Sequence, residues 1–353
     1  MIAVSADARL RTACNDFTER RLALGRRACI FGASALALLC LGSAGPASAQ
    51  AQLHPSKPIR IIVGSAVGGS LDVQARIIGQ ALPKALGRDI VIENRPGGNG
   101  IIGGQLVANS TRDGSRLFAY GGDLFSLGAL MPRSDFDAGI QLVAISQISE
   151  SPLLVVTGGR SSFNDVKGMI AAANAAPQGL TYATFAFASV NNVVGQWIAK
   201  EARIKMLNVT YRSGAEAALA AAAGDVSLAI VSPASVFPSL VSAGAVKVIA
   251  LTSAQRPSYL PASWPTLAES GLPIDASTFF GIFGAAGMSS AAIVRLDHAF
   301  STVLNDVAVR ERLRQVGMFA QHLGPAELAK RIKTDRRRYG RIIEEMNMVD
   351  ALR

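Results

Sequence analysis

Short apolar runs alternate with glycine-rich turns between residues 58 and 120, and this alternation constrains the fold more than any other feature. Strands are expected at residues 58–63, 90–93 and 116–120. The turn at 64–70 leads into a helix from about Leu71 to Leu86, and the turn at 94–100 leads into a second helix. Strands and helices in this order predict a parallel sheet with helices on its faces.

The rest of the chain predicts a second domain and a return to the first. Of two apolar runs within 142–156, the second, Leu153–Val156, predicts a crossover. Strands are then expected at 180–183, 207–211, 226–231 and 246–251, with helices near 163–173, through Val193–Ile198, and at 215–223. A return strand at 279–284 and helices at about 290–315 and 325–346 complete the chain. The 353 residues exceed the ~100–200 of one domain, so we assign 53–153 with 276–353 to one domain and 154–275 to the other.

The first 49 residues predict a secretory signal peptide. A basic block with Arg26 and Arg27 precedes an apolar run from Ala28 to about Leu41, and Ala47-Ser48-Ala49 forms an A-x-A cleavage site. The apolar run is shorter than the ~20 residues that a membrane span needs, which disfavours an anchor. The paired arginines leave twin-arginine and general secretory export both open. We therefore expect an exported protein cleaved near Ala49.

Cysteine and histidine are too sparse for several kinds of catalytic or metal site. All three cysteines, Cys14, Cys29 and Cys40, precede the predicted cleavage site, so the mature protein has no disulfide and no thiol nucleophile. The three histidines, His54, His298 and His322, are far apart in sequence. A histidine-based catalytic triad or a zinc site is therefore disfavoured. We expect no catalytic residues, no metal and no cofactor.

The positive charge is concentrated near the C-terminus. The formal net charge is +10, and residues 310–341 contain ten Lys and Arg against three acidic residues. A nucleic-acid interface would use such a patch, but aromatic side chains are not interleaved with these basic residues, since Phe319 and Tyr339 are the two aromatic residues in the range. The spacing of Leu328, Ile332, Tyr339 and Ile343 instead predicts an amphipathic helix with a solvated basic face. We expect no nucleic-acid partner.

Glycine-rich and polar loops that precede helices are the candidate binding segments. In open α/β sheets, ligands bind at the carboxyl ends of strands, where helix N-termini favour anions. The candidate ligand-binding residues are Ser65, Val67, Gly68, Gly69 and Asp72 in the first loop, Gly97, Gly98 and Asn99 in the second, and Thr184, Phe187, Ser189, Asn192, Tyr211 and Arg212 in the other domain. Neither glycine loop has the spacing of a phosphate-binding P-loop or a dinucleotide site.

Some of these residues have an alternative, structural interpretation. Asp72 is compatible with a ligand-facing role and with stabilisation of the helix dipole in a first turn. Arg95 and Arg212 are compatible with a carboxylate clamp. Arg95 also precedes Pro96, where it is suited to bracing the loop, and this second interpretation is the one we favour.

An ordered series of strings resembles a known family. They are Pro55–Val63 with Gly68–Asp72, Glu93–Gly100, Asp113-Gly114, Tyr211 with Gly214, Ala250–Ser253 with Arg256, Pro265–Gly271, and Phe280-Gly281. In this order, over about residues 53–350, they resemble the receptors of the tripartite tricarboxylate transporter family, also called Bug proteins. The resemblance implies a two-lobed α/β periplasmic binding protein of type II. Each lobe would be a mainly parallel sheet flanked by helices, with the ligand cleft between lobes.

The resemblance also implies a function. Such receptors bind citrate-like acids, dicarboxylates, acidic amino acids or aromatic acids, largely through backbone amides and waters at the first two glycine loops. The other lobe would supply hydroxyl groups and a further loop. A membrane permease of the same transporter type would be the partner, and a monomer is expected. A receptor that reports to a sensor kinase is the alternative, and an enzyme on a similar frame is disfavoured because the chain lacks a nucleophile–base pair.

The sequence departs from the family pattern in both lobes. Gly64, Ser65 and Val67 stand where the family has two prolines and an aromatic residue. In the second lobe, alanines replace two family glycines within Thr184–Ser189, which also contains Phe185 and Phe187. These changes predict a wider pocket with an apolar or stacking wall. Our hypothesis is a ligand bulkier or less polar than citrate, such as an aromatic monocarboxylate.

Overall fold

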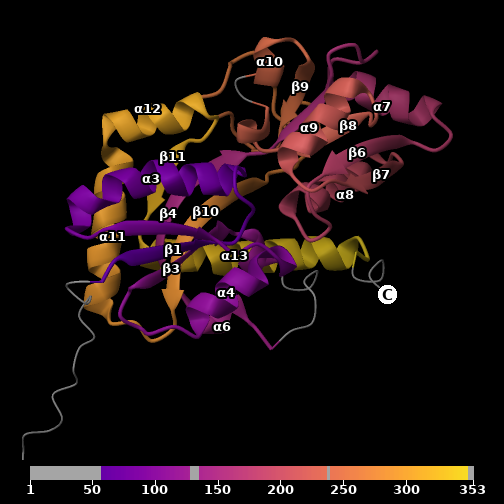
Figure 1. Ribbon diagram of the computed structural model, residues 1–353. Helices are drawn as coiled ribbons and strands as arrows, with labels where there is room; N and C mark the ends of the chain where they lie inside the picture. Colours follow the sequence, from indigo (N-terminus) through magenta and orange to yellow (C-terminus); the bar gives the residue numbers. More distant parts are fainter. Residues whose placement is uncertain (1–56, 128–134, 237–238, 349–353) are drawn as a thin grey trace, which may run out of the picture. The chain divides into compact units, whose positions relative to one another are not determined.

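The computed structural model describes residues 57–127, 135–236 and 239–348, which belong to one compact unit of the chain. The predicted signal peptide lies outside the described residues. Two mixed β-sheets flanked by helices form this unit (Figure 1). The first sheet contains β1 (Ile59–Val63), β2 (Ile90–Asn94), β3 (Arg116–Gly121), β4 (Leu142–Pro152), β10 (Ser277–Ala285) and β11 (Ala320–Leu323). The second sheet contains β5 (Leu154–Gly158), β6 (Leu180–Thr184), β7 (Met206–Thr210), β8 (Leu228–Val231) and β9 (Val246–Leu251).

Each sheet combines parallel and antiparallel pairs. The first has the order β11-β4-β10-β3-β1-β2, and β1 pairs in parallel with both β2 and β3, as the sequence predicted. The second has the order β7-β6-β8-β5-β9, with β6 parallel to β7 and β8. The antiparallel pairs in both sheets involve β4, β5 and β10, the strands at which the chain passes between sheets. The sheets are therefore mixed rather than mainly parallel, because the crossing strands join them from the opposite direction.

The first sheet is covered by helices on both faces. Ile59, Ile61 and Val63 on β1 face one core, and Ile62, between them, faces the other, as the alternation of a strand requires. The first core is closed by α3 (Ser70–Leu86), α11 (Ser290–Asn305) and α12 (Val307–Gln315). The second is closed by α4 (Ile101–Ala108), α5 (Asp123–Ser126), α6 (Ala138–Gln141) and the start of α13 (Pro325–Glu345). With helices on both faces, β1 can be apolar along nearly its whole length.

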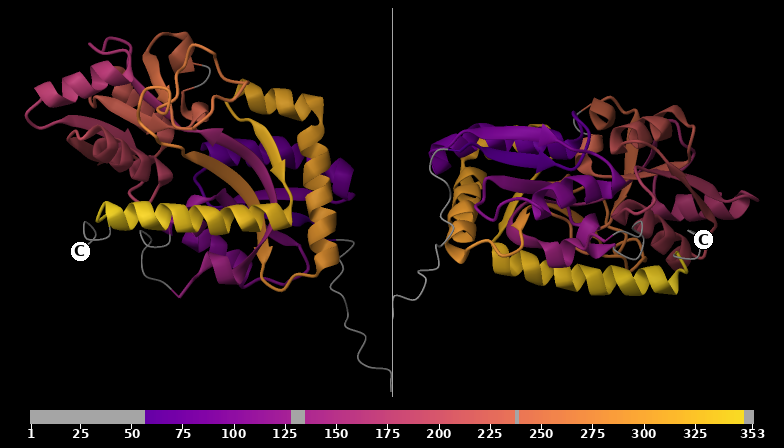
Figure 2. Two further views of the ribbon diagram at one scale, coloured as in Figure 1. Left: turned by 180° about the vertical axis from the view of Figure 1, so that it is seen from behind. Right: turned by 60° about the horizontal axis from the view of Figure 1, so that its bottom comes forward.

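The second sheet is covered in the same way. On one face α7 (Val166–Ala175) and α8 (Val190–Ala202) close a core around Tyr182, and on the other α9 (Gly214–Ala223) and α10 (Ser239–Ser242) close a second. The long helix α13 passes from the first sheet to the second, as the two views of Figure 2 show. Its residues Tyr339 and Ile343 lie in the core beside α8. The C-terminal helix is therefore a third connection between the sheets, in addition to β4–β5 and β9–β10.

Most predicted elements are present, and one prediction at the C-terminal side is wrong. The single helix expected at 290–315 is two helices, α11 and α12, separated by Asp306. The backbone of Asp306 is extended, and its Oδ1 atom accepts hydrogen bonds from the N–H groups of Ala308 at 2.8 Å and Val309 at 3.1 Å. Asp306 thus ends one helix and caps the next, because its short carboxylate competes for backbone N–H groups. The short strand β11 was not predicted.

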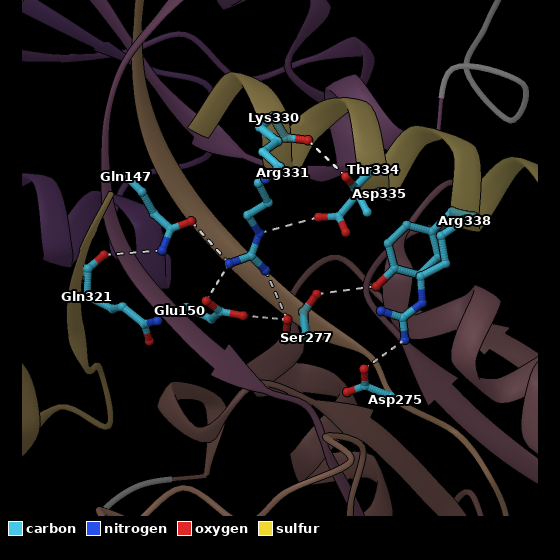
Figure 3. A network of polar contacts seen from close by, with 11 residues as sticks. Gln147, Glu150, Asp275, Ser277, Gln321, Lys330, Arg331, Thr334, Asp335 and Arg338 are labelled. Atoms are coloured by element: carbon cyan, nitrogen blue, oxygen red, sulfur yellow. Dashed lines mark hydrogen bonds and ion pairs between the residues drawn. The ribbon is translucent and has the colours of Figure 1, made fainter. Parts of the chain in front are cut away.

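A polar network attaches α13 to the two strands that cross between sheets (Figure 3). Arg331 on α13 is ion-paired with Glu150 of β4 and donates to Gln147 Oε1 at 3.1 Å and to Ser277 Oγ of β10 at 2.9 Å. Ser277 Oγ in turn donates to Glu150 Oε1 at 2.6 Å. The Arg331 guanidinium lies 4.5 Å from the centroid of the Phe279 ring. The side chains of Arg331 and Glu150 are 14% and 22% exposed, so water does not fully hydrate either group. Each group therefore needs the other to compensate its charge.

We predict that Arg331→Leu lowers the free energy of unfolding by about 3 kcal/mol, because the largely buried Glu150 side chain would lose its cationic partner. Chemical denaturation at neutral pH measures this change. Arg337→Leu, at an exposed position on the same helix, is the matched control and is expected to cost about 0.5 kcal/mol or less. Equal losses in the two variants would show that the network does not stabilise the protein.

Candidate functional site

The carboxyl ends of three neighbouring parallel strands meet at one edge of the first sheet. Val63, the last residue of β1, lies opposite Asn94 at the end of β2 and opposite Ala119 near the end of β3. The chain leaves these strands through the two glycine loops, at 64–69 and 95–100, and through the turn that leads to α5. The parallel register therefore brings the first two candidate segments together, as predicted.

The ring of Tyr120 fills the space between the two glycine loops. A Cβ atom added to Gly64 would lie 2.5 Å from Cδ2 of Tyr120, and one added to Gly100 would lie 2.6 Å from its Cζ atom. Tyr120 also stacks on Phe118, with ring centroids 5.5 Å apart. Both glycines are thus needed for close approach to the ring, and Gly100 is needed also for its φ of 89°.

Asp72, in the first turn of α3, links the first loop to the end of β2 through hydrogen bonds. Its carboxylate accepts hydrogen bonds from the N–H of Gly68 at 2.9 Å, from Asn94 Nδ2 at 2.9 Å and from Arg76 Nε at 3.0 Å. The residue is 2% exposed, and burial alone would raise its pKa, but the hydrogen bonds from Arg76, Gly68 and Asn94 outweigh burial and lower it. Asn94 Nδ2 also donates to the backbone oxygen of Ser65 at 3.1 Å. These contacts engage the Asp72 carboxylate within the chain and favour a structural role at the start of α3 over direct contact with a ligand.

The helices that follow the two loops begin differently from most others. The N-caps of α3 and α4 are Gly69 and Gly100, and no described side chain caps either helix. Side chains do cap α6, α7, α8, α9, α11 and α12, namely those of Asp137, Asp165, Ser189, Ser213, Ser289 and Asp306. The first-turn N–H groups of a helix have no acceptor within the helix. Those of α3 and α4 are therefore suited to an acceptor from outside the chain, and an anion is the favoured one.

The second loop is a run of left-handed backbone. Residues 97–100 all have positive φ, and Asn99, the one residue among them with a side chain, has a φ of 51°. Its Nδ2 atom donates to the backbone oxygen of Ala188 at 3.3 Å. Ala188 lies between β6 and α8, so Asn99 reaches from the first sheet to the segment beside the second. This strained geometry is typical of functional loops.

In the segment before α8, the predicted polar residues are engaged with their own neighbours. Thr184 Oγ1 accepts from Asn208 Nδ2 at 2.9 Å. Ser189 Oγ donates to the oxygen of Ala186 at 2.6 Å and caps α8, and Asn192 Nδ2 donates to the oxygen of Phe187 at 2.9 Å. All three polar residues are fully buried. These three residues stabilise the segment 184–192, which we call the bend. The side chains of Phe185 and Phe187 within it are partly exposed.

The remaining candidates lie on or near the surface. Val67 is 73% exposed at the tip of the first loop, and Arg212 is exposed beyond β7, where its N–H donates to Glu216 Oε2 at 3.1 Å. The N–H of Tyr211 donates to the oxygen of Thr184 at 2.7 Å. Arg95 is ion-paired with Glu93, which agrees with the bracing role that we favoured.

Two side chains at this edge of the described structure have an unpaired oxygen: Ser65, which was a predicted candidate, and Asp123, which was not predicted. Ser65 Oγ and Asp123 Oδ1 are buried and have no hydrogen-bond partner among the described residues. Asp123 follows β3 as the first residue of α5, and burial raises its pKa to about 7, opposed by the N–H of Val190 at the start of α8. The signal in the sequence was Gly121-Gly122-Asp123 directly after the third strand, which repeats the strand-then-glycine pattern of the first two loops.

Comparison with known proteins places this geometry in a family. Residues 74–348 match the sequence model of the tripartite tricarboxylate transporter family receptors. The chain belongs to this family. It is 28% identical to the protein BugT of Bordetella pertussis over 307 residues, which cover 86% of this chain and 93% of BugT. As a member, it is a solute-binding receptor of the periplasmic type and not an enzyme.

Solved structures show the same fold. Rpa4515 of R. palustris, solved with adipate, has a TM-score of 0.76 at 23% identity and covers 83% of this chain and 98% of its own. MatC from Rhodopseudomonas palustris, solved with bound malate, has a TM-score of 0.74 at 23% identity and covers 82% of this chain and all of its own. The predicted α/β binding-protein fold is thereby confirmed.

Within the described ranges, none of the helices combines the length and the hydrophobicity that a membrane span requires.

We predict that Gly100→Ala costs about 2–4 kcal/mol of unfolding free energy, because it combines a left-handed backbone with a clash against Tyr120. Gly224→Ala is the matched control, since Gly224 has nearly the same φ, 88°, but no described atom within 4 Å of an added Cβ. It should cost about 1–2 kcal/mol. Thermal or chemical denaturation measures both, and equal costs would contradict the packing role of Tyr120.

Proposed function

We propose that this protein captures a small carboxylate-bearing solute outside the cytoplasm and delivers it to a membrane permease of the tripartite tricarboxylate type. The supporting observation is the pair of helix N-termini, those of α3 and α4, that no described side chain caps and that follow two adjacent parallel strands. Family membership supports the transport role, and relatives solved with adipate and malate support the carboxylate.

Backbone groups would do most of the binding. The N–H groups at the start of α3 and α4 point along each helix axis and carry the positive end of its dipole. A bound carboxylate would accept hydrogen bonds from them and would not be chemically altered. Gly68, Gly69, Gly97 and Gly98 have no side chain to prevent a close approach of the ligand. Ser65 Oγ, buried and unpaired, is suited to donate one further hydrogen bond. Nothing in this arrangement requires a nucleophile or a metal.

We further propose that the two sheets are the cores of two lobes, with residues 53–153 and 276–353 in one and residues 154–275 in the other. The crossing strands β4–β5 and β10 would then act as a hinge, and closure would bring the bend at 184–192 and the Tyr211–Arg212 loop onto the ligand. The contact between Asn99 and Ala188 supports such an approach. We expect the receptor to act as a monomer.

The ligand is expected to have an apolar part. Phe185 and Phe187 are partly exposed within the bend, and the hydroxyl and amide groups around them are already hydrogen-bonded within the bend. A side of the site made of aromatic rings and satisfied polar groups favours an aromatic or aliphatic surface over the many hydroxyl and carboxyl groups of citrate. An aromatic monocarboxylate fits these features.

We predict that the purified mature protein binds benzoate more tightly than citrate or tartrate, in a calorimetric panel that also contains adipate and malate. Phe185→Ala should weaken benzoate binding about fivefold, which corresponds to about 1 kcal/mol for a lost ring contact. Val294→Ala, at an exposed position on α11, is the control and should leave Kd unchanged. Binding of citrate or tartrate alone would contradict the aromatic ligand, and binding of no acid at all would contradict the receptor site.

The exported location yields a separate prediction. When the whole chain is expressed in a Gram-negative host, the periplasmic protein should begin at or near Gln50, because Ala47 and Ala49 are the small residues that signal peptidase requires. Mass spectrometry of the periplasmic fraction measures this. Ala49→Leu should leave the leader attached, whereas Ser48→Leu, at the unconstrained middle position, should not. A full-length wild-type chain in the periplasm would contradict the predicted cleavage.

A further inference from the structure

The carboxyl group of Asp123 lies at the same edge as the proposed carboxylate site and is not among the groups proposed to bind the ligand. Asp123 follows β3 through Gly122, at the edge where the loops after β1 and β2 begin. The residue as a whole is partly exposed, but its Oδ1 atom is buried and has no hydrogen-bond partner among the described residues. An unpaired carboxyl oxygen that is shielded from water is unfavourable. A ligand group would therefore supply the hydrogen-bond partner that Asp123 Oδ1 lacks.

Asp123 and the second glycine loop approach the same segment. The backbone N–H of Val190, the first residue of α8, interacts with the Asp123 carboxyl group. Two residues earlier, the oxygen of Ala188 accepts from Asn99 Nδ2 at 3.3 Å. Asp123 thus stands between the loops of the first sheet and the start of α8, where a closing receptor would enclose its ligand.

The groups around Asp123 do not compensate its charge. Tyr120 on β3 and Tyr339 on α13 face it, and burial raises the pKa of both, so they stay neutral at ordinary pH. On α13 the charged groups near Tyr339 are Asp335, Arg338 and Arg331, of which Arg331 is paired with Glu150. On the side of α6, Asp137 lies 3.8 Å from Arg336. Burial is the larger influence on Asp123 and raises its pKa to about 7, while the Val190 N–H opposes this rise.

We infer that Asp123 is a proton-linked binding residue, whose protonated carboxyl donates a hydrogen bond to the carboxylate of the bound solute. This inference rests on the proposed function, since it requires an acid at the ends of β1 and β2. The proton comes from the solvent, stays on Asp123 while the ligand is bound, and returns to solvent on release. No covalent bond forms or breaks.

The charges of Asp123 and the ligand determine whether affinity rises or falls with pH. A second carboxylate close to Asp123 disfavours its ionised form, so binding of an anion raises the pKa of Asp123 further. The receptor then takes up a proton with its ligand, and affinity rises as pH falls. A ligand that placed an ammonium group on Asp123 would prefer the ionised form and give the opposite slope. The inferred ligand class is therefore an acid with no cationic group at this position.

The test is the pH dependence of binding for the tightest of the probes benzoate, adipate and malate, between about pH 6 and 8.5. A group with a pKa of about 7 is about 90% protonated at pH 6 and about 3% at pH 8.5, so Kd should rise about 30-fold. Calorimetry in buffers of different ionisation enthalpy should detect uptake of about 0.9 proton per ligand at pH 8. This second measurement needs no variant.

Two variants separate Asp123 from other titrating groups. Asp123→Asn carries an N–H donor at every pH, so its Kd should vary less than twofold over the range and its binding should take up no proton. Asp165→Asn, which retains the N-cap of α7, should keep the wild-type slope. A flat wild-type profile, an inverted slope, or an unchanged slope in Asp123→Asn would overturn the proton-linked role while leaving the receptor intact. Absence of binding to every probe at every pH would overturn the receptor function as well.

Discussion

The contact between Tyr120 and the two glycine loops organises the candidate binding edge of the first sheet. The ring occupies the volume that side chains at Gly64 and Gly100 would need, and it is supported from behind by Phe118. Asp72 and Asn94 then tie the first loop to the second through hydrogen bonds. The first loop is therefore held by packing on Tyr120 and by hydrogen bonds to the end of β2. The helices α3 and α4, which follow the two loops, begin without a described side-chain cap.

The two sheets contribute different chemistry to this place. On the first sheet, α3 and α4 begin without a described side-chain cap, and Ser65 Oγ and Asp123 Oδ1 have no hydrogen-bond partner among the described residues. On the second, Ser189 caps α8, and Thr184 and Asn192 are hydrogen-bonded within their own segment. A buried polar group without a partner is unfavourable, so the first sheet would gain more than the second from the proposed ligand. The second sheet offers a preformed bend with aromatic side chains, which is suited to shape selection.

Most of the strand and helix order was predictable because most of these elements have a local signal, whereas several site features depend on tertiary packing. The parallel register that aligns Val63 with Asn94 follows from the strand–loop–helix repeat, and the glycine loops could be assigned from composition. The role of Asp72 could not be decided from the sequence, because its partner Asn94 lies at the end of β2 and approaches Asp72 only in the folded chain. The break at Asp306 was missed because the apolar spacing continues across it. Asp123 was missed because its burial depends on segments distant in sequence.

The crossing strands link this edge to the network around Arg331. The N–H of Gly122 donates to the oxygen of Phe279 on β10 at 3.0 Å, and a Cβ atom on Gly122 would lie 2.2 Å from the Phe279 ring. The guanidinium of Arg331 lies over the Phe279 ring, 4.5 Å from its centroid, and is paired with Glu150 on β4. The turn that presents Asp123 is thus packed directly on a strand that α13 fixes to its neighbour. A rotation at β4 and β10 must either carry this turn with it or break its contact with Phe279, because a well-packed aromatic ring leaves little room for sliding. The position of Asp123 against α8 is therefore set by the same strands that would serve as the hinge.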